Sequence, residues 1–326
     1  MLSFFKKAYF LNYLTAFIII IICWLPAFFI PQDSISLEVL QYDSILKSGF
    51  NNVYLLNSFG LFVTLISALI LNYLSTENGF TGKLMTMGIF FFSILSVSLS
   101  PFAIMNPFIL INFFLFFFIR NLYRLPNVEN PIPLVFNASL MLGLSSLYFF
   151  KIIFLVVVVW VALIIHRLNS WRNYIASIIG IIVPYLFVIT WYFWSDQLND
   201  FILKMEMMFI FRLITDLSMG INDFIILVII AGLIIIGVFK TITHLTEKNI
   251  NLRRNLIISI YFLIIALIIV VIFGQGIKSL LITIIPASII LSNAFYDLRR
   301  YRFYNIFFSV LIVFIMINQF LKLFLD

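Results

Sequence analysis

The chain has 326 residues, of which 64% are hydrophobic and 10% are charged, and its mean hydropathy is +1.17. A soluble domain usually carries about a quarter charged residues, so this composition excludes a water-soluble globular protein and predicts a chain dissolved in lipid. The formal net charge of +7 does not indicate a nucleic-acid-binding protein, because the basic residues cluster beside apolar runs, as membrane topology requires.

The first apolar run, 10–30, is too long for the hydrophobic region of a signal peptide and lacks a small-x-small cleavage site. We therefore interpret it as a retained first helix. The lone Cys23 lies inside this run and has no second cysteine with which to form an internal disulfide.

A membrane-spanning helix needs about 20 mostly apolar residues. The sequence predicts an all-α fold, a polytopic transmembrane helical bundle that forms a single integral membrane domain over residues 1–326. We count about 11 spans. They lie near 10–30, 53–74, 84–100, 102–122, 132–150, 152–166, 173–194, 221–239, 255–273, 277–295 and 304–324.

The pair of short segments around Lys151 could form two tightly turned helices or one long tilted helix. With eleven spans and a cytoplasmic amino terminus, 14 basic residues fall inside and 6 outside. Merging the pair would move Arg167, Arg172 and the basic cluster of 240–254 outside. The positive-inside rule therefore favours eleven spans, with the amino terminus inside and the carboxy terminus outside.

The acidic residues sort the opposite way, with 4 inside and 9 outside. Acids contribute little to orientation, so insertion alone does not explain this bias. Most of the outer acids lie in two segments, 31–52 and 195–222, which are predicted to be the only long extracytoplasmic loops.

In the first of these segments, Pro31 ends a span and Asp33 or Ser34 can cap a new helix. One narrow face of that helix is apolar, which predicts a short amphipathic helix lying along the outer interface. The apolar face consists of Ile35, Val39, Tyr42 and Leu46.

Two roles remain open for the acids of 31–52. Asp33, Glu38 and Asp43 could simply keep the interfacial helix at the membrane surface. Alternatively, Asp33 or Asp43 is catalytic and points into a cleft, where a carboxylate could act as a general base or hold a divalent cation near a phosphate.

In the second segment, Lys204 and Arg212 are eight residues apart, about 12 Å along a helix. Two cations at that spacing could bind a diphosphate group. They could equally extend their charged ends to lipid headgroups.

Three prolines, Pro107, Pro184 and Pro286, fall within predicted spans. We expect them to kink helices whose freed backbone groups are satisfied by neighbouring helices. The alternative is that they mark broken helices lining a cavity.

Several chemistries find no support in the sequence. His166 and His244 fall in separate cytoplasmic loops, so no metal site is predicted. Residues 78–83, NGFTGK, lack the GxxxxGK spacing of a phosphate-binding loop, and no cofactor is indicated.

The stretches LISALILNYLSTENGF and FAIMNPFILINFFLFFFIRNLYRLP, together with FNASLMLGLSSLYFFKIIFLVVVVWVALIIHRLNSWRNYIASIIGIIVPYLFVITWYF, resemble an uncharacterised polytopic inner-membrane family of the Bacteroidota. Some members carry an automatic carotene-oxygenase label. This sequence contradicts that label, because the chemistry needs four histidines on iron and the chain has 2.

The architecture also resembles, more distantly, the GT-C glycosyltransferases, which use polyprenyl-phosphate-linked sugar donors. That resemblance implies a catalytic acid in the first outer loop, beside a short interfacial helix, and Asp33 or Asp43 would have that role. The sequence departs from the pattern because 31–52 contains no DxD or ExD motif.

Two functions follow as hypotheses. The first is a transferase at the outer leaflet of the inner membrane, with membrane lipid and a polyprenyl-phosphate-linked substrate as partners, Asp33 or Asp43 as base, and Lys204 or Arg212 on phosphate. The second is a non-enzymatic membrane component, namely a transporter, a flippase or a subunit of an envelope-assembly complex.

Overall fold

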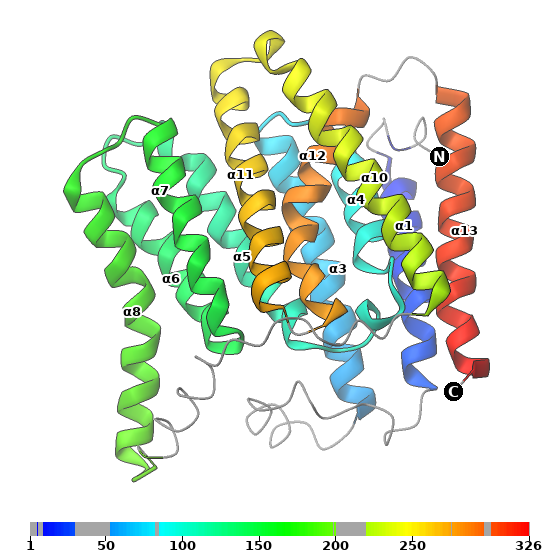
Figure 1. Cartoon of the computed structure of the whole chain (residues 1–326), viewed down its shortest axis with the longest axis horizontal. Coiled ribbons are helices and arrows are strands. Elements are labelled where there is room, and N and C mark those ends of the chain that lie inside the picture. The colour runs from blue at the N-terminus through cyan, green and yellow to red at the C-terminus, as the bar shows by residue number, and fades with distance from the viewer. Residues whose placement is uncertain are drawn as a thin grey trace.

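The computed structural model describes residues 5, 9–29, 53–81, 85–197, 199, 220–274, 276–296 and 301–325. Every regular element within these residues is helical (Figure 1), which confirms the predicted all-α class. The α-helices are α1 (Phe10–Trp24), α3 (Val53–Glu77), α4 (Met87–Ser96), α5 (Pro107–Arg124), α6 (Ile132–Tyr148), α7 (Val156–Ile165), α8 (Trp171–Trp194), α10 (Ile221–Thr243), α11 (Ile250–Phe273), α12 (Ile284–Tyr296) and α13 (Tyr301–Leu325). The short 3-10 helices are η1 (Leu25–Phe28), η4 (Ser100–Phe102), η5 (Leu125–Asn127), η6 (Phe150–Leu155), η7 (Leu245–Glu247) and η8 (Ile277–Thr283).

Eight helices in the described part of the chain are long and apolar enough to cross a membrane. The protein is therefore a multi-pass integral membrane protein. Three shorter apolar helices, Met87–Ser96, Ile132–Tyr148 and Phe150–Ile165, coincide with the other predicted spans. Because these three are shorter than the roughly 20 residues that a spanning helix needs, the count of eleven stays a prediction.

The segments on either side of Lys151 form two helices rather than one. Helix α6 ends at Tyr148, and the extended backbone of Phe149 (φ −144°, ψ 98°) breaks the helical path before η6 begins. The chain then reverses direction into α7, which packs against α6 (Figure 1).

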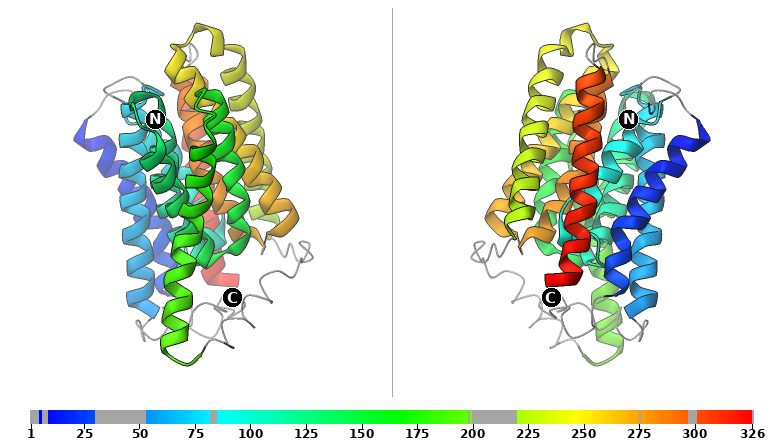
Figure 2. Two further views of the ribbon diagram at one scale, coloured as in Figure 1. Left: turned by 90° about the vertical axis from the view of Figure 1, so that its left-hand side faces the viewer. Right: turned by 90° about the vertical axis from the view of Figure 1, so that its right-hand side faces the viewer.

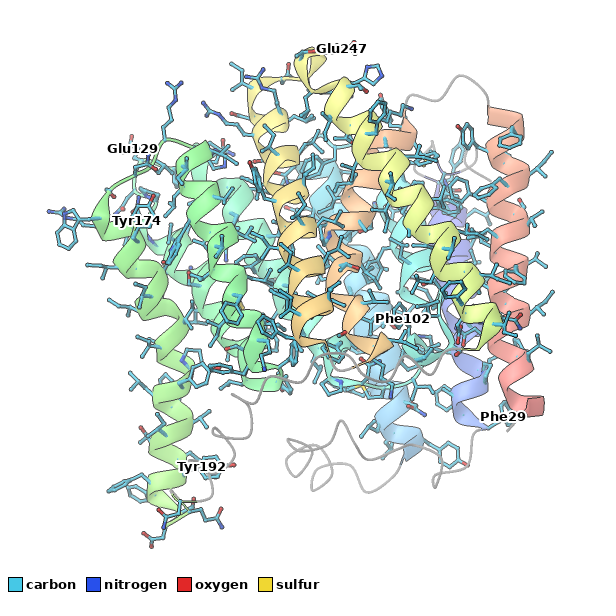
Figure 3. The ribbon with its side chains drawn as sticks, viewed as in Figure 1. Phe29, Phe102, Glu129, Tyr174, Tyr192 and Glu247 are labelled. Carbon is cyan, nitrogen blue, oxygen red and sulfur yellow. The ribbon has the colours of Figure 1, made fainter. Side chains whose placement is uncertain are left out.

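The helices run back and forth between two ends of the bundle. We call these the upper and lower ends, as they stand in Figure 1. Figure 3 shows Glu129 and Glu247 at the upper end, and Phe29 and Tyr192 at the lower end. Helix α1 begins towards the upper end, whereas α13 finishes at the lower end (Figure 2).

The centre of the bundle is built from α4 and α12. Every residue of α4 is buried, and 89% of the most apolar window of the span Ile277–Tyr296, which η8 and α12 form together, is buried, compared with 17% for α10. Aromatic rings fill the contacts around them: the rings of Phe90 and Phe91 lie 5.7 Å and 5.5 Å from that of Phe308 on α13. The outer helices therefore shield a central pair from lipid.

Helix α8 packs closely on α6 and exposes its other side. A Cβ at Gly180 would lie 2.7 Å from the carbonyl oxygen of Phe136, so only glycine permits this approach. On the far side Trp171 and Trp191 are exposed. Their separation along the helix is about 30 Å, which matches the hydrocarbon thickness that interfacial tryptophans bracket.

Of the three prolines expected inside spans, Pro107 lies at the start of its span, whereas Pro184 and Pro286 lie within theirs, Pro286 in the first turn of α12. Pro107 is the first residue of α5, and Pro286 follows the junction of η8 with α12; Pro184 alone lies well inside a helix. Proline suits a first helical turn because the N–H it lacks has no partner there anyway. Between α4 and α5 the chain forms a mostly buried, largely non-helical segment, 97–106, which we call the 97–106 loop.

Candidate functional site

The four residues predicted to form a site, Asp33, Asp43, Lys204 and Arg212, lie outside the described residues. The helix ends that flank their two segments are described. Helix η1 ends at Phe28 and α3 begins at Val53, while α8 ends at Trp194 and α10 begins at Ile221. All four helix ends lie at the lower end of the bundle (Figure 1).

A buried carboxylate, Asp223, also lies at the lower end. It sits in the first turn of α10 and is 7% exposed, and it is the only buried acid in the described part of the chain. A charge in an apolar environment is costly unless donors surround it, so the partners of this carboxylate are informative.

Asp223 accepts hydrogen bonds from two other elements. The backbone N–H and the hydroxyl of Ser100, in η4, donate to its Oδ1 and Oδ2 at 3.0 Å and 2.6 Å. The side-chain amide of Asn318, on α13, donates to Oδ1 at 2.7 Å. Short donor contacts to a carboxylate are the charge-assisted kind, which are stronger than neutral hydrogen bonds.

The 97–106 loop is held by further side chains from the surrounding helices. The amide of Gln319, on α13, donates to the carbonyl oxygens of Val97 and Leu99 at 2.9 Å and 3.0 Å. The side-chain oxygen of Asn57, on α3, accepts the Met105 N–H at 3.2 Å. Non-helical backbone at membrane depth is tolerated when protein groups satisfy it in this way.

Asn57 extends the network to the first helix. Its side-chain nitrogen donates to the carbonyl oxygen of Ala27, in η1, at 2.9 Å. The 97–106 loop is therefore linked to η1 and α3, which flank segment 31–52, and through Asp223 to α10, whose start borders the second segment. Figure 3 shows Phe102 of this loop near the lower end.

The chemistry available to Asp223 is limited by its own contacts. A carboxylate offers about four lone-pair positions, and three donor groups already use Asp223. We therefore assign it a positioning role: it fastens the 97–106 loop to α10 and α13.

The upper end has a different character. Its described helix ends and turns carry nine basic residues and three acids. Glu77 lies 3.9 Å and 3.7 Å from the guanidinium nitrogens of Arg120 and Arg124, and these side chains are partly exposed. The basic residues are Arg120, Arg124, Arg167, Arg172, Lys240, Lys248, Arg253, Arg254 and Arg302, and the acids are Glu77, Glu129 and Glu247.

The two histidines lie apart at the upper end. His244 contacts Glu247 at 3.1 Å and is exposed, whereas His166 is buried where α7 ends. Burial, with the charge of Arg254 as a smaller cause, lowers the pKa of His166 to about 4. Within the described residues no group of three His, Cys, Asp or Glu side chains could hold a metal ion.

Sequence reasoning counted Asp223 among the outer acids but assigned it no role. It also missed Asn318 and Gln319, although two adjacent amides in an otherwise apolar span, IMINQFLKL, are a usable signal. Polar side chains inside membrane helices usually face the bundle interior, and these two do.

No curated protein and no solved structure matches the chain significantly. One family model matches residues 34–324, a range that contains Asp43, Lys204, Arg212 and Asp223. The match begins in the segment 31–52 and continues almost to the end of α13. The chain therefore belongs to the family of unknown function DUF6427.

Proposed function

We propose that this protein is a transferase of a bacterial inner membrane that takes a sugar or related group from a polyprenyl-phosphate-linked donor at the outer leaflet, with a GT-C-like architecture. One observation carries the proposal. The helix ends flanking both candidate segments lie at the same end of the bundle, where the buried Asp223 fastens the 97–106 loop.

Charge supports the orientation that the proposal requires. Nine basic residues lie at the upper end of the described chain, whereas the lower end has three, Lys151, Lys278 and Lys322. Because basic residues concentrate on the cytoplasmic side, the upper end faces the cytoplasm and the lower end faces outward in this proposal.

The residues have distinct roles in the proposed reaction. Asp33 or Asp43 takes the proton of an acceptor hydroxyl, whose oxygen forms the new bond to the transferred group. The lipid phosphate leaves with the electron pair of the broken bond, and Lys204 or Arg212 stabilises its charge. Asp223 acts at one remove, because it helps to position the helices that flank these segments.

The test compares three isosteric substitutions within one segment, Asp33→Asn, Glu38→Gln and Asp43→Asn. Loss of a general base typically slows a reaction by about a hundredfold or more. We expect Asp33→Asn or Asp43→Asn to abolish complementation of a deletion strain, while membrane protein levels stay normal. Glu38→Gln is the matched control and should complement.

Turnover of a polyprenyl-phosphate-linked sugar by the purified full chain provides the second readout. An inactive variant should still fold and bind the lipid but release no polyprenyl phosphate. Equal tolerance at all three acidic positions would overturn the transferase proposal and favour a non-enzymatic role in transport or envelope assembly.

A further inference from the structure

A small cavity lies beside the 97–106 loop and η8, the two places where the chain departs from regular α-helix in this part of the bundle. Its walls come from five elements: α3, α4, η4, α5 and η8. They meet where the 97–106 loop packs beside η8, which leads into α12. The lining residues are Thr64, Ser67, Phe92, Ser96, Phe102, Ile109, Asn112 and Leu281. The cavity has room for about one water-sized occupant.

Two buried polar atoms in this wall have no hydrogen-bond partner within the described part of the chain. They are the hydroxyl oxygen of Ser67 and the side-chain oxygen of Asn112, whose residues are 2% and 4% exposed. Leaving a buried acceptor unpaired is costly, and two such atoms in the wall of one cavity point to an occupant that contacts both.

The orientation of the Asn112 amide is fixed by its surroundings. Its nitrogen donates to the carbonyl oxygen of Leu281 at 2.9 Å, so the unpaired atom is the oxygen. A flipped amide would place two oxygens against each other. The cavity therefore receives an acceptor from α5.

The other polar groups in the wall also present lone pairs. The Thr64 hydroxyl donates to Leu61 O at 2.7 Å and the Ser96 hydroxyl donates to Ser93 O at 3.1 Å, so their protons point away from the cavity. The backbone N–H of Ile109 is likewise used, by Asn106 O. Among the hydroxyl groups of the wall only that of Ser67 keeps an unused donor, and the others present oxygen lone pairs, which disfavours an anion.

We infer that this cavity is a binding site for a sodium ion. Its ligands are the side-chain oxygens of Thr64, Ser67, Ser96 and Asn112. Sodium is a hard cation that takes oxygen ligands, and no charged side chain among the described residues lines the cavity, which disfavours a divalent ion. Ser96 ends α4, and the negative pole of that helix favours a cation.

The proposed ion would also link the 97–106 loop to η8. Ser96 leads into the 97–106 loop, and Asn112 is bonded to Leu281 of η8. An ion shared by these walls stabilises the folded state in proportion to its occupancy. The inference does not depend on the proposed transferase activity, because none of its residues belongs to 31–52 or 195–222.

The test is thermal unfolding of the purified full chain in detergent, with chloride salts of sodium, potassium and choline at equal ionic strength. We expect the unfolding midpoint to rise with sodium concentration, and potassium and choline to have little effect. Binding of radioactive sodium to the same protein gives the dissociation constant directly.

Two substitutions and one control locate the site. Ser67→Ala and Thr64→Val each remove one ligand oxygen and should weaken sodium binding by about tenfold or more. Ser98→Ala removes a buried hydroxyl that donates to Leu95 O and does not line the cavity, so sodium binding should be unchanged. If one of the two variants fails to fold, sodium binding by the other tests the site.

Three results would overturn the inference. Equal unfolding midpoints in all three salts would mean that the cavity holds only water. Sodium stabilisation that survives both substitutions would place the ion elsewhere. A larger effect of potassium would contradict the assignment of sodium.

Discussion

The two ends of this bundle use charge in different ways. At the upper end the side chains of the Glu77 ion pairs are partly exposed, between 29% and 49%. At the lower end Asp196 is exposed, but Asp223 is 7% exposed and receives donors from η4 and α13. Exposed charges orient a chain in the membrane, whereas a buried charge must be built into the packing.

The comparison has a consequence for where function lies. Solvated ion pairs contribute little to stability and leave their helices free to adjust. The Asp223 network instead joins segments that are 123 and 95 residues away in sequence. Neutral side chains brace the upper end, where the Asn293 amide donates to the Phe80 carbonyl oxygen at 2.9 Å, so what distinguishes the lower end is that a buried charge provides the support that a precise site needs.

The largest expected effect is all-or-none and concerns which end faces outward. The experiment treats intact cells with an impermeant thiol reagent. The cells carry single-cysteine variants in a Cys23→Ala background, namely Asp43→Cys, Gln197→Cys, Lys248→Cys or Arg300→Cys. We expect labelling at 43 and 197 only, because basic residues, which are concentrated at the upper end, mark the cytoplasmic side. Labelling at 248 or 300 would reverse the assignment of the two ends.

The second prediction removes the buried carboxylate. Asp223→Ala leaves the Ser100 N–H and the Asn318 amide without their acceptor. A buried neutral donor left without an acceptor typically costs about 1–3 kcal/mol, so the free energy of unfolding should fall by several kcal/mol. The measurement is denaturant unfolding in detergent.

Asp223→Asn sharpens this second test. The substituted amide keeps one acceptor oxygen, so its loss of stability should be clearly smaller than that of Asp223→Ala. Equal and minor losses for both variants would mean that the carboxylate does not hold the 97–106 loop.

The sequence was sufficient for the helical class and for the long spans. Runs such as 250–273 are apolar throughout, and burial of the backbone in lipid leaves a helix as the available form. The concentration of acidic residues in the segments 31–52 and 195–222 was also evident from the sequence. Asp33, Asp43, Lys204 and Arg212 lie outside the described residues, so their roles stay predictions.

The sequence alone did not predict where α4 ends or which side chains hydrogen-bond to Asp223. The predicted span at 84–100 continues past Ser96, where α4 ends; the serines at 93, 96, 98 and 100 and the following Pro101 were the available signal, because serine and proline favour turns. The contacts of Asp223 with Ser100 and Asn318 depend on tertiary packing, which local periodicity does not encode. Polar residues in apolar spans were the available clue.

The third prediction concerns the buried histidine of the upper end. The pKa of His166 is lowered to about 4 from its usual 6.5, so the unfolded chain binds the proton more readily. The contribution of neutral His166 to the free energy of unfolding is therefore fully present above pH 6.5 and is lost as the pH falls towards 4. The loss is on the order of 2 kcal/mol.

Variants of the two histidines test this pH dependence. His166→Leu cannot be protonated and should remove that part of the decline in unfolding free energy between pH 6.5 and 4. His244→Gln changes an exposed histidine and is the matched control. A decline of the same size in His166→Leu would show that other groups cause it.

The smallest expected effect belongs to the exposed ion pairs. Glu77→Gln removes the charge that faces Arg120 and Arg124 at 3.9 Å and 3.7 Å. Because water screens both pairs, the free energy of unfolding should fall by about 1 kcal/mol or less. The difference from wild type should shrink further in about 1 M salt, where the Debye length is about 3 Å. A loss as large as that of Asp223→Ala, or one that is insensitive to salt, would mean that the upper end also depends on a buried charge and that the contrast between the two ends is wrong.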